Sequence, residues 1–494
     1  MLESAEVGHK VGKALFAREE RKLREALLNG QYDMGVAKRG PVLILISGLE
    51  GGGRGETANK LNEWMDPRFI RTHAFGPGAP EEEARPLAWR YWRALPPRGK
   101  IGIFVNAWYR QLVIAHVRHE VTDAQFNARL QEVRQYEQML TDEGIVLLKF
   151  WIHLSRAGQK QRLKDLSSDP KTRWRVTAID KQELKHYNRY HGKWEQMLRE
   201  TSIGPAPWYV VEGTDSNYRN LTVGKILQEA LVKINAGAKP QPRAVVAPAP
   251  SVIGNVALIR RLDLTQKLDE KTYDRDLAKW QERLAWLTQR KQFRDRSLVL
   301  AFEGSDAAGK GGAIRRAATS FDARQFVVVP IAAPSEEELA QPFLWRFWRQ
   351  IPARGGITIF DRTWYGRVLV ERVEGYCGVS DWMRAYDEIN QFEEQLVRAG
   401  AVICKFWLQI SKEEQLKRFE LRQKTAFKRF KITKDDWRNR KKWAAYEQAV
   451  SDMVDRTSTE LARWTLVEAE DKYFARVKIL KTIAMQLEQA LGKS

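Results

Sequence analysis

The chain of 494 residues carries 83 Lys and Arg against 62 Asp and Glu, a net charge of +21, and 43% of its residues are hydrophobic. This length and composition exclude a disordered or fibrous chain and are typical of a globular protein with several domains. The positive charge indicates a polyanionic partner such as nucleic acid, an anionic membrane or polymeric phosphate, although a basic but solvated surface would give the same total.

The cysteine content and the lack of long apolar runs indicate the cellular compartment in which the protein is expected. Cys377 and Cys404 are the only cysteines, too few for a disulfide framework or a zinc site with four thiolates. No apolar run approaches 18 residues, and the opening MLESAEVGHK lacks the basic and then apolar pattern of a secretory signal. We therefore expect a cytoplasmic protein that does not enter a membrane.

The first half of the chain alternates short apolar runs with longer helical patterns. A charged segment at residues 11–29 predicts a helix, and the alternation behind it is typical of parallel β-α-β units. The first strand leads into GLEGGGRGE, a glycine-rich loop with Arg54 where phosphate-binding loops normally carry lysine. The predicted strands are VLILIS (42–47), FIRTHAF (69–75), IGIFVN (101–106), IVLLKFWIHL (145–154) and WYVVEG (208–213).

A proline-rich segment separates two similar halves. Residues 235–252, NAGAKPQPRAVVAPAPSV, contain four prolines and predict an extended linker. The pattern of the first half then returns at a constant offset, because Gly304 minus Gly48 and Trp364 minus Trp108 are both 256. This self-similarity predicts a tandem duplication, with domains at residues 1–234 and 253–494.

The second half repeats the same order of elements. A charged segment at residues 267–291 predicts a helix before the first strand. We expect an α/β protein of two tandem P-loop-kinase-like domains, each a three-layer α/β/α sandwich with a mostly parallel five-stranded sheet and a helical lid. The predicted strands are SLVLAF (297–302), QFVVVPIA (325–332), GITIFD (356–361), AVICKFWLQI (401–410) and WTLVEA (464–469).

The loop after the first strand of the second half predicts a phosphate site. Gly304 to Lys310 fits G-x-x-x-x-G-K between a strand and a helix. In such a loop backbone N–H groups converge on phosphate oxygens, the helix N-terminus adds positive potential, and Lys310 adds a mobile charge. A glycine-rich turn is the structural alternative. The remaining candidate phosphate- or nucleotide-binding positions are Ala307, Ala308, Gly309, Gly311 and Gly312.

The same loop departs from the usual motif at its metal-binding position. Gly311 stands where Ser or Thr normally holds Mg²⁺. Two carboxylates at the same sheet edge are the candidate ligands, Asp306 in the loop and Asp361 at the end of ITIFD. Asp361 could instead cap a helix. Arg362 follows directly, and its fork suits phosphate oxygens unless it is a plain surface residue.

A strongly basic segment resembles a lid over the phosphates. Residues 411–442 hold 13 Lys and Arg against 5 Asp and Glu, and a helix pair of this kind can close over a polyanion. A solvated face is the alternative for each residue singly. The aromatic residues Trp345, Phe347 and Trp348 could stack a base, but their helical spacing favours the core. The candidate phosphate contacts of the lid are Arg418, Arg422, Lys428, Arg429 and Lys431.

At these residues the second half resembles the second family of polyphosphate kinases. The similarity covers EGSDAAGKGG, EEELAQPFLWRFWRQIPARG, FDRTWYGRVLVERVEGYC and the basic segment that follows. The resemblance implies transfer of a phosphoryl group from polyphosphate to AMP, with Mg²⁺ as cofactor and the second domain as the active one. It also implies catalytic roles for Asp306, Lys310, Asp361 and Arg362. The turn ITKDD differs from the single-domain members, so the acceptor is less firmly implied than the donor.

The first half lacks the chemistry of the second. At the shared offset Lys310 corresponds to Arg54, Asp306 to Glu50, Asp361 to Val105 and Arg362 to Asn106. A planar guanidinium does not replace a cradled ammonium, and valine cannot ligate a metal. We therefore predict that the first domain keeps the fold and is not catalytic.

Other functions fit parts of the sequence. A nucleoside monophosphate kinase with ATP as donor shares the fold and loop but leaves the charge unexplained. A polyphosphate-dependent kinase acting on ADP or guanine nucleotides is barely distinguishable. A nucleic-acid-binding ATPase would explain the charge, yet no known binding module is present, and we expect no nucleic acid. Homo-oligomerisation is left open.

Overall fold

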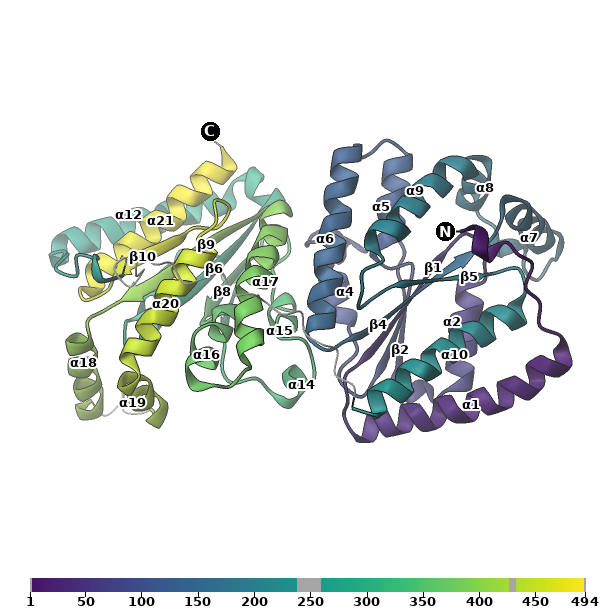
Figure 1. The fold of residues 1–494 in the computed structure, drawn as a ribbon. Helices are drawn as coiled ribbons and strands as arrows, with labels where there is room; N and C mark the ends of the chain where they lie inside the picture. Colours follow the sequence, from purple (N-terminus) through teal and green to yellow (C-terminus); the bar gives the residue numbers. More distant parts are fainter. Residues whose placement is uncertain (1, 238–258, 426–431, 493–494) are drawn as a thin grey trace. The chain divides into compact units, whose positions relative to one another are not determined.

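The computed structural model describes residues 2–237, 259–425 and 432–492. They form two compact units, each built around one sheet (Figure 1). Most of the predicted linker and the candidate lid residues Lys428, Arg429 and Lys431 lie outside the described residues, so these assignments stay predictions. None of the described helices combines the length and the apolar character needed to cross a bilayer.

The first sheet has five parallel strands in the order β2-β3-β1-β4-β5. All five coincide with predicted strands. The central strand β1 is buried throughout, which explains why it reads as a continuous apolar run. The strands are β1 (Val42–Gly48), β2 (Ile70–Ala74), β3 (Ile101–Val105), β4 (Val146–His153) and β5 (Trp208–Glu212).

Helices cover both faces of the first sheet. One face packs against α1, α2 and α10, and α5, α6 and α9 lie against one another on the other, where α6 contacts β4. The helix predicted at residues 11–29 is observed and extends to Val36. The helices of the first half are α1 (Lys13–Val36), α2 (Arg54–Trp64), α3 (Pro80–Glu83), α4 (Ala88–Ala94), α5 (Trp108–Val117), α6 (Asp123–Asp142), α7 (Arg156–Ser168), α8 (Ala178–Lys185), α9 (Tyr187–Thr201) and α10 (Ser216–Asn235).

The second sheet repeats the first. Its order is β10-β9-β6-β8-β7, the same topology in the corresponding strands, and every pairing is parallel. Tandem duplication is therefore visible in the sheet topology as well as in the sequence. The strands are β6 (Ser297–Gly304), β7 (Phe326–Pro330), β8 (Ile357–Asp361), β9 (Ala401–Gln409) and β10 (Trp464–Glu468).

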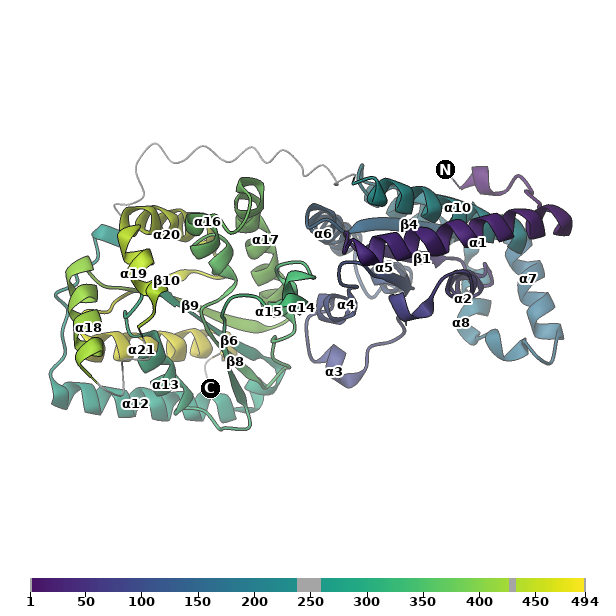
Figure 2. The same cartoon turned by 90° about the horizontal axis from the view of Figure 1, so that it is seen from below.

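The second sheet also lies between two helix layers (Figure 2). The layer with α17 and α20 faces one side, and α12, α13 and α21 cover the other. The described helices of this half are α12 (Glu270–Gln289), α13 (Lys310–Ala318), α14 (Glu336–Leu339), α15 (Trp345–Trp348), α16 (Val370–Glu374), α17 (Val379–Arg398), α18 (Lys412–Lys424), α19 (Lys434–Lys441), α20 (Trp443–Thr457) and α21 (Lys472–Leu491).

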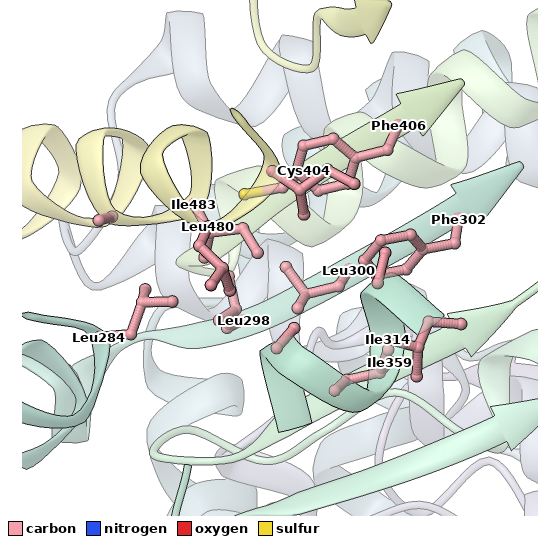
Figure 3. Close-up of a cluster of buried hydrophobic side chains, with 14 of the residues drawn as sticks. Leu284, Leu298, Leu300, Phe302, Ile314, Ile359, Cys404, Phe406, Leu480 and Ile483 are labelled. Carbon is pink, nitrogen blue, oxygen red and sulfur yellow. The ribbon is translucent and has the colours of Figure 1, made fainter. Parts of the chain in front are cut away.

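An apolar core fixes the β6 edge that carries the loop. Leu298, Leu300 and Phe302 of β6 are fully buried against Ile314 of α13 and Leu480 of α21 (Figure 3). Burial of each such side chain contributes about 1.5–3 kcal/mol. The strand end and the start of α13 are thereby held rigidly around the loop between them.

Each unit buries a Lys–Glu ion pair, and the two pairs lie at equivalent positions of the repeat. Lys149 Nζ lies 2.7 Å from Glu137 Oε2, and Lys405 Nζ lies 2.7 Å from Glu393 Oε2. Each lysine also donates to a backbone carbonyl at the end of a helix. Burial lowers the pKa of both lysines, while the paired carboxylates oppose this shift.

Candidate phosphate-binding site

The loop between β6 and α13 has the backbone of a phosphate-binding loop. Gly304, Ala307 and Gly309 have φ of 154°, 63° and 112°, and Gly309 caps α13. Within the described residues, no protein acceptor receives the N–H of Ala307, Gly309 or Gly311, whereas Ala308 and Gly312 donate within the loop. Free N–H groups at the start of a helix are suited to anionic oxygens.

Lys310 folds back over this loop. Its Nζ donates to Gly304 O at 2.5 Å and to Ser305 O at 3.4 Å. Burial lowers the pKa of Lys310, and the neighbouring carboxylate of Asp306 opposes the shift. The ammonium group therefore sits among the loop carbonyls, next to the positions where phosphates would bind.

The two candidate metal ligands come from different elements, Asp306 from the loop itself and Asp361 from the end of β8. Asp306 Oδ1 lies 3.4 Å from Arg362 Nη2, and Asp306 Oδ2 accepts from Asn439 Nδ2 at 2.9 Å. Asp361 ends β8 and is paired in register with Phe302, two residues before the end of β6 at Gly304. Three predicted residues thus meet at one sheet edge, as the parallel topology requires.

Glu303 belongs to the same edge and was missed by the sequence analysis. Its side chain is buried, and Oε1 accepts from Thr363 N at 2.7 Å and from Thr363 Oγ1 at 2.8 Å. Burial raises the pKa of Glu303, with Lys310 opposing the shift. The corresponding residue of the first half is Ser47, a difference at the shared offset that could have identified Glu303.

Arg362 adopts an unusual backbone conformation. Its φ is 65°, a left-handed value that is costly for arginine, and its N–H donates to Phe302 O at 3.1 Å. The side chain is 57% exposed. The strand-to-helix turn after β8 thus presents a guanidinium group toward the loop and toward solvent.

A cavity of about 410 Å³ opens beside the loop. Asp306, Arg362 and Asn439 line its polar side, whereas Trp443 and Tyr446 contribute aromatic surface. These two aromatic residues and Asn439 were not singled out by sequence reasoning. By contrast, the residues weighed there for base stacking are buried in the core, namely Trp345, Phe347 and Trp348.

A smaller basic cavity of about 180 Å³ lies beneath the loop and is lined by Arg418, Arg422 and Arg476. Arg418 is buried and donates to the carbonyl groups of Ala307 and Ala308 at 3.0 and 3.1 Å. Arg418 therefore stabilises the backbone of the loop through two of its carbonyl groups. Direct contact of Arg418 and Arg422 with phosphate stays a prediction.

The described residues contain no group of three or more His, Cys, Asp or Glu side chains placed to hold a metal ion. Asp306 and Asp361 offer the oxygen atoms that Mg²⁺ prefers, and Mg²⁺ is commonly held by one or two carboxylates together with substrate phosphates. The available donors therefore fit a magnesium ion that binds with its substrate.

The first unit keeps the backbone of this loop. Gly48, Gly51 and Gly53 have φ of 145°, 80° and 97° at the positions of Gly304, Ala307 and Gly309. Asn106, which corresponds to Arg362, also has a left-handed φ of 56°. Val105 ends β3 where β8 ends in an aspartate.

Charged side chains at the loop of the first unit form ion pairs with one another. Arg54 donates to Gly48 O at 2.8 Å and pairs with Glu50 at 2.5 Å. Arg110 joins Glu50 to Glu183 at 2.8 and 2.7 Å. Burial raises the pKa of Glu50, but Arg54 and Arg110 outweigh it, so the net pKa is lowered. The cations of this loop already have internal anions as partners.

Each unit is therefore an α/β domain of the kinase type, with a loop that has the backbone of a phosphate-binding loop at the carboxyl edge of its sheet. The family model described as Polyphosphate kinase 2 (PPK2) matches residues 10–239 and again residues 267–494. The chain belongs to the polyphosphate kinase 2 family, which confirms the resemblance seen in the sequence.

Individual relatives match over the whole length. The chain is 53% identical to Polyphosphate:AMP phosphotransferase of Pseudomonas aeruginosa, with both chains fully covered. It is 36% identical to the protein of that name from Acinetobacter johnsonii, covering 95% of this chain and 96% of the other. A crystal structure assigned to a polyphosphate kinase 2 of Pseudomonas aeruginosa PA01 is 51% identical with a TM-score of 0.91, and all of both chains is covered.

Proposed function

We propose that this chain transfers the terminal phosphoryl group of inorganic polyphosphate to AMP, giving ADP and a polyphosphate shorter by one unit, and that the second unit carries the reaction. The main support for the activity is the full-length identity of 53% to a polyphosphate:AMP phosphotransferase. The assignment to the second unit rests on its lysine and its strand-end aspartate, which the first unit replaces with Arg54 and Val105.

The roles follow from charge. The reaction breaks the bond from the terminal phosphorus to the bridging oxygen and forms one to an oxygen of AMP. Two unit negative charges about 4 Å apart repel by roughly 4 kcal/mol at an effective dielectric of ~20. In this proposal Lys310, Arg362 and the loop N–H groups offset that repulsion. Asp306 and Asp361 would hold Mg²⁺, which would supply further positive charge next to the phosphates.

No strong base is required of the protein. The second pKa of a phosphate monoester is about 6, so the phosphate of AMP is already ionised at neutral pH. The site has only to align the two anions and exclude water. The cavity with Trp443 and Tyr446 has a polar and an aromatic side, which suits a nucleoside monophosphate.

A coupled assay tests the proposal directly. AMP, ADP, GMP and GDP are each offered with polyphosphate and Mg²⁺, and AMP is offered separately with ATP. We expect ADP formation from AMP and polyphosphate to be fastest, and expect it to stop when a chelator removes Mg²⁺. Faster turnover with ATP as donor, or with ADP or GDP as acceptor, would contradict the proposed substrate pair.

The cytoplasmic location is part of the same proposal. Cys377 and Cys404 are both free thiols in the structure, which suits a reducing compartment. AMP and ADP are cytoplasmic metabolites in this scheme, so substrate and enzyme share one compartment.

A further inference from the structure

The first unit has a basic hollow that is separate from its phosphate-type loop. It measures about 420 Å³ and lies between α7 and α8, which are neighbours in both views (Figures 1 and 2). The segment that forms it, residues 156–185, holds 9 Lys and Arg against 4 Asp and Glu. The cations that line the hollow are Arg156, Lys160, Lys164, Lys181 and Lys185.

Among the residues that the structure describes, these five cations have no carboxylate partner. Within the described part of the chain, none of them makes an ion pair or a side-chain hydrogen bond. The nearby acids are engaged elsewhere, since Asp180 caps α8 through Thr177 and Glu183 pairs with Arg110. Asp165 accepts from Gln161 on the same helix. The positive charge of the hollow is therefore not neutralised from within the unit.

The corresponding helix pair of the second unit, α18 and α19, is joined by an aromatic contact. At the shared offset of 256, Lys160 corresponds to Leu416, Lys164 to Glu420 and Lys181 to Trp437. Trp437 packs edge-on against Phe419, with ring centroids 5.1 Å apart, and so joins α18 to α19. In the first unit lysines replace an apolar, an acidic and an aromatic residue. The same changes remove the packing and concentrate positive charge.

We propose that this hollow binds a segment of inorganic polyphosphate, as a second polymer contact apart from the catalytic loop. The inference rests on polyphosphate being the substrate. Lysine ammonium groups are mobile point charges that suit a flexible chain with a negative charge on every phosphate. Among the lining residues no aromatic ring is available to stack a base, which favours polyphosphate over single-stranded nucleic acid. In this proposal the first unit binds the polymer although the second unit carries the reaction.

Hydrogen–deuterium exchange on the full-length chain tests the site locally. Saturating polyphosphate is expected to protect peptides from residues 156–185 and, separately, peptides covering the loop at 304–312. The combined variant Lys160→Gln, Lys164→Gln and Lys181→Gln should lose the first protection and keep the second. The matched control removes the same charge from exposed lysines elsewhere in the unit, at Lys13, Lys22 and Lys233, and should keep both.

The outcomes separate this inference from the proposed function. Protection at 304–312 without protection at 156–185, or protection at 156–185 that survives in the hollow variant, would overturn the second site alone. Absence of protection in both regions would overturn the polyphosphate reaction as well. In a parallel experiment, single-stranded DNA replaces polyphosphate at equal charge concentration. If DNA protects the peptides from residues 156–185 as strongly as polyphosphate or more strongly, the hollow would be assigned to nucleic acid instead.

Discussion

Removing the loop cation of the second unit should strongly lower the activity of the chain, whereas removing the loop cation of the first unit should leave that activity nearly unchanged. Lys310 contacts Gly304 O in the second unit, and Arg54 contacts the corresponding Gly48 O in the first. The two side chains thus occupy equivalent places. Arg54 differs because it is paired with Glu50 at 2.5 Å. The test is to compare Lys310→Met with Arg54→Met, since methionine keeps the length of the side chain and removes its charge.

The expected magnitude follows from the charge that Lys310 brings to the transferred phosphate. A cation about 4 Å from a unit negative charge contributes roughly 4 kcal/mol at an effective dielectric of ~20. Each 1.36 kcal/mol of barrier is a factor of ten, so Lys310→Met should lower kcat/KM by about 1000-fold. Arg54→Met should change kcat/KM by less than about twofold, because the charge of Arg54 is already neutralised by the carboxylate of Glu50.

The assay measures ADP formed from AMP and long-chain polyphosphate with Mg²⁺ at fixed pH. A thermal melt of each variant checks folding, because Arg54→Met leaves Glu50 with Arg110 as its remaining partner and should cost about 1 kcal/mol of unfolding free energy. Comparable losses of kcat/KM in two folded variants would refute the assignment of catalysis to the second unit. So would full activity of Lys310→Met.

Further predictions concern the cavity, the core and pH. Trp443→Ala should raise KM for AMP by about 5- to 150-fold, since stacking of a base contributes about 1–3 kcal/mol, and should leave KM for polyphosphate unchanged. Glu393→Leu should lower the free energy of unfolding in urea by about 3–5 kcal/mol because Lys405 is left buried and unpaired, and adding Lys405→Met should restore most of it. Burial lowers the pKa of His153 below its usual value of about 6.5, although Glu6 opposes the shift. Stability should therefore be complete above about pH 6.5 and fall as pH drops toward the lowered folded-state pKa, and melts of His153→Gln should show a weaker loss.

Local sequence patterns were enough to predict most of the fold. Strand positions follow from runs of apolar residues whose burial the sheet confirms, as in VLILIS of β1. The loop motif could also be recognised in the sequence, because Gly304 and Lys310 lie only six positions apart. The structure then shows Gly304 at a positive φ. The constant offset of 256 predicted two sheets of the same topology, and it identified Val105 as the position that lacks a carboxylate.

The sequence could not indicate which distant side chains complete the site. Asn439 reaches Asp306 from α19, and Trp443 and Tyr446 line the cavity from α20, although all three lie more than 130 positions from Asp306. Glu303 lies between the predicted strand and the loop motif, and only the folded chain shows that it accepts hydrogen bonds from Thr363.

By itself, the sequence determined the duplicated α/β fold, the phosphate-binding loop and the family, because each depends on residues close together in the chain or on a fixed repeat. The tertiary structure alone decided what Arg54 does, since its fate depends on Glu50 and on the Arg110–Glu183 pair brought from two further helices. It also decided that α7 and α8 enclose an unneutralised basic hollow where the second unit packs Trp437. Charges can be counted in a sequence, but whether they neutralise one another depends on distances that only the folded chain fixes.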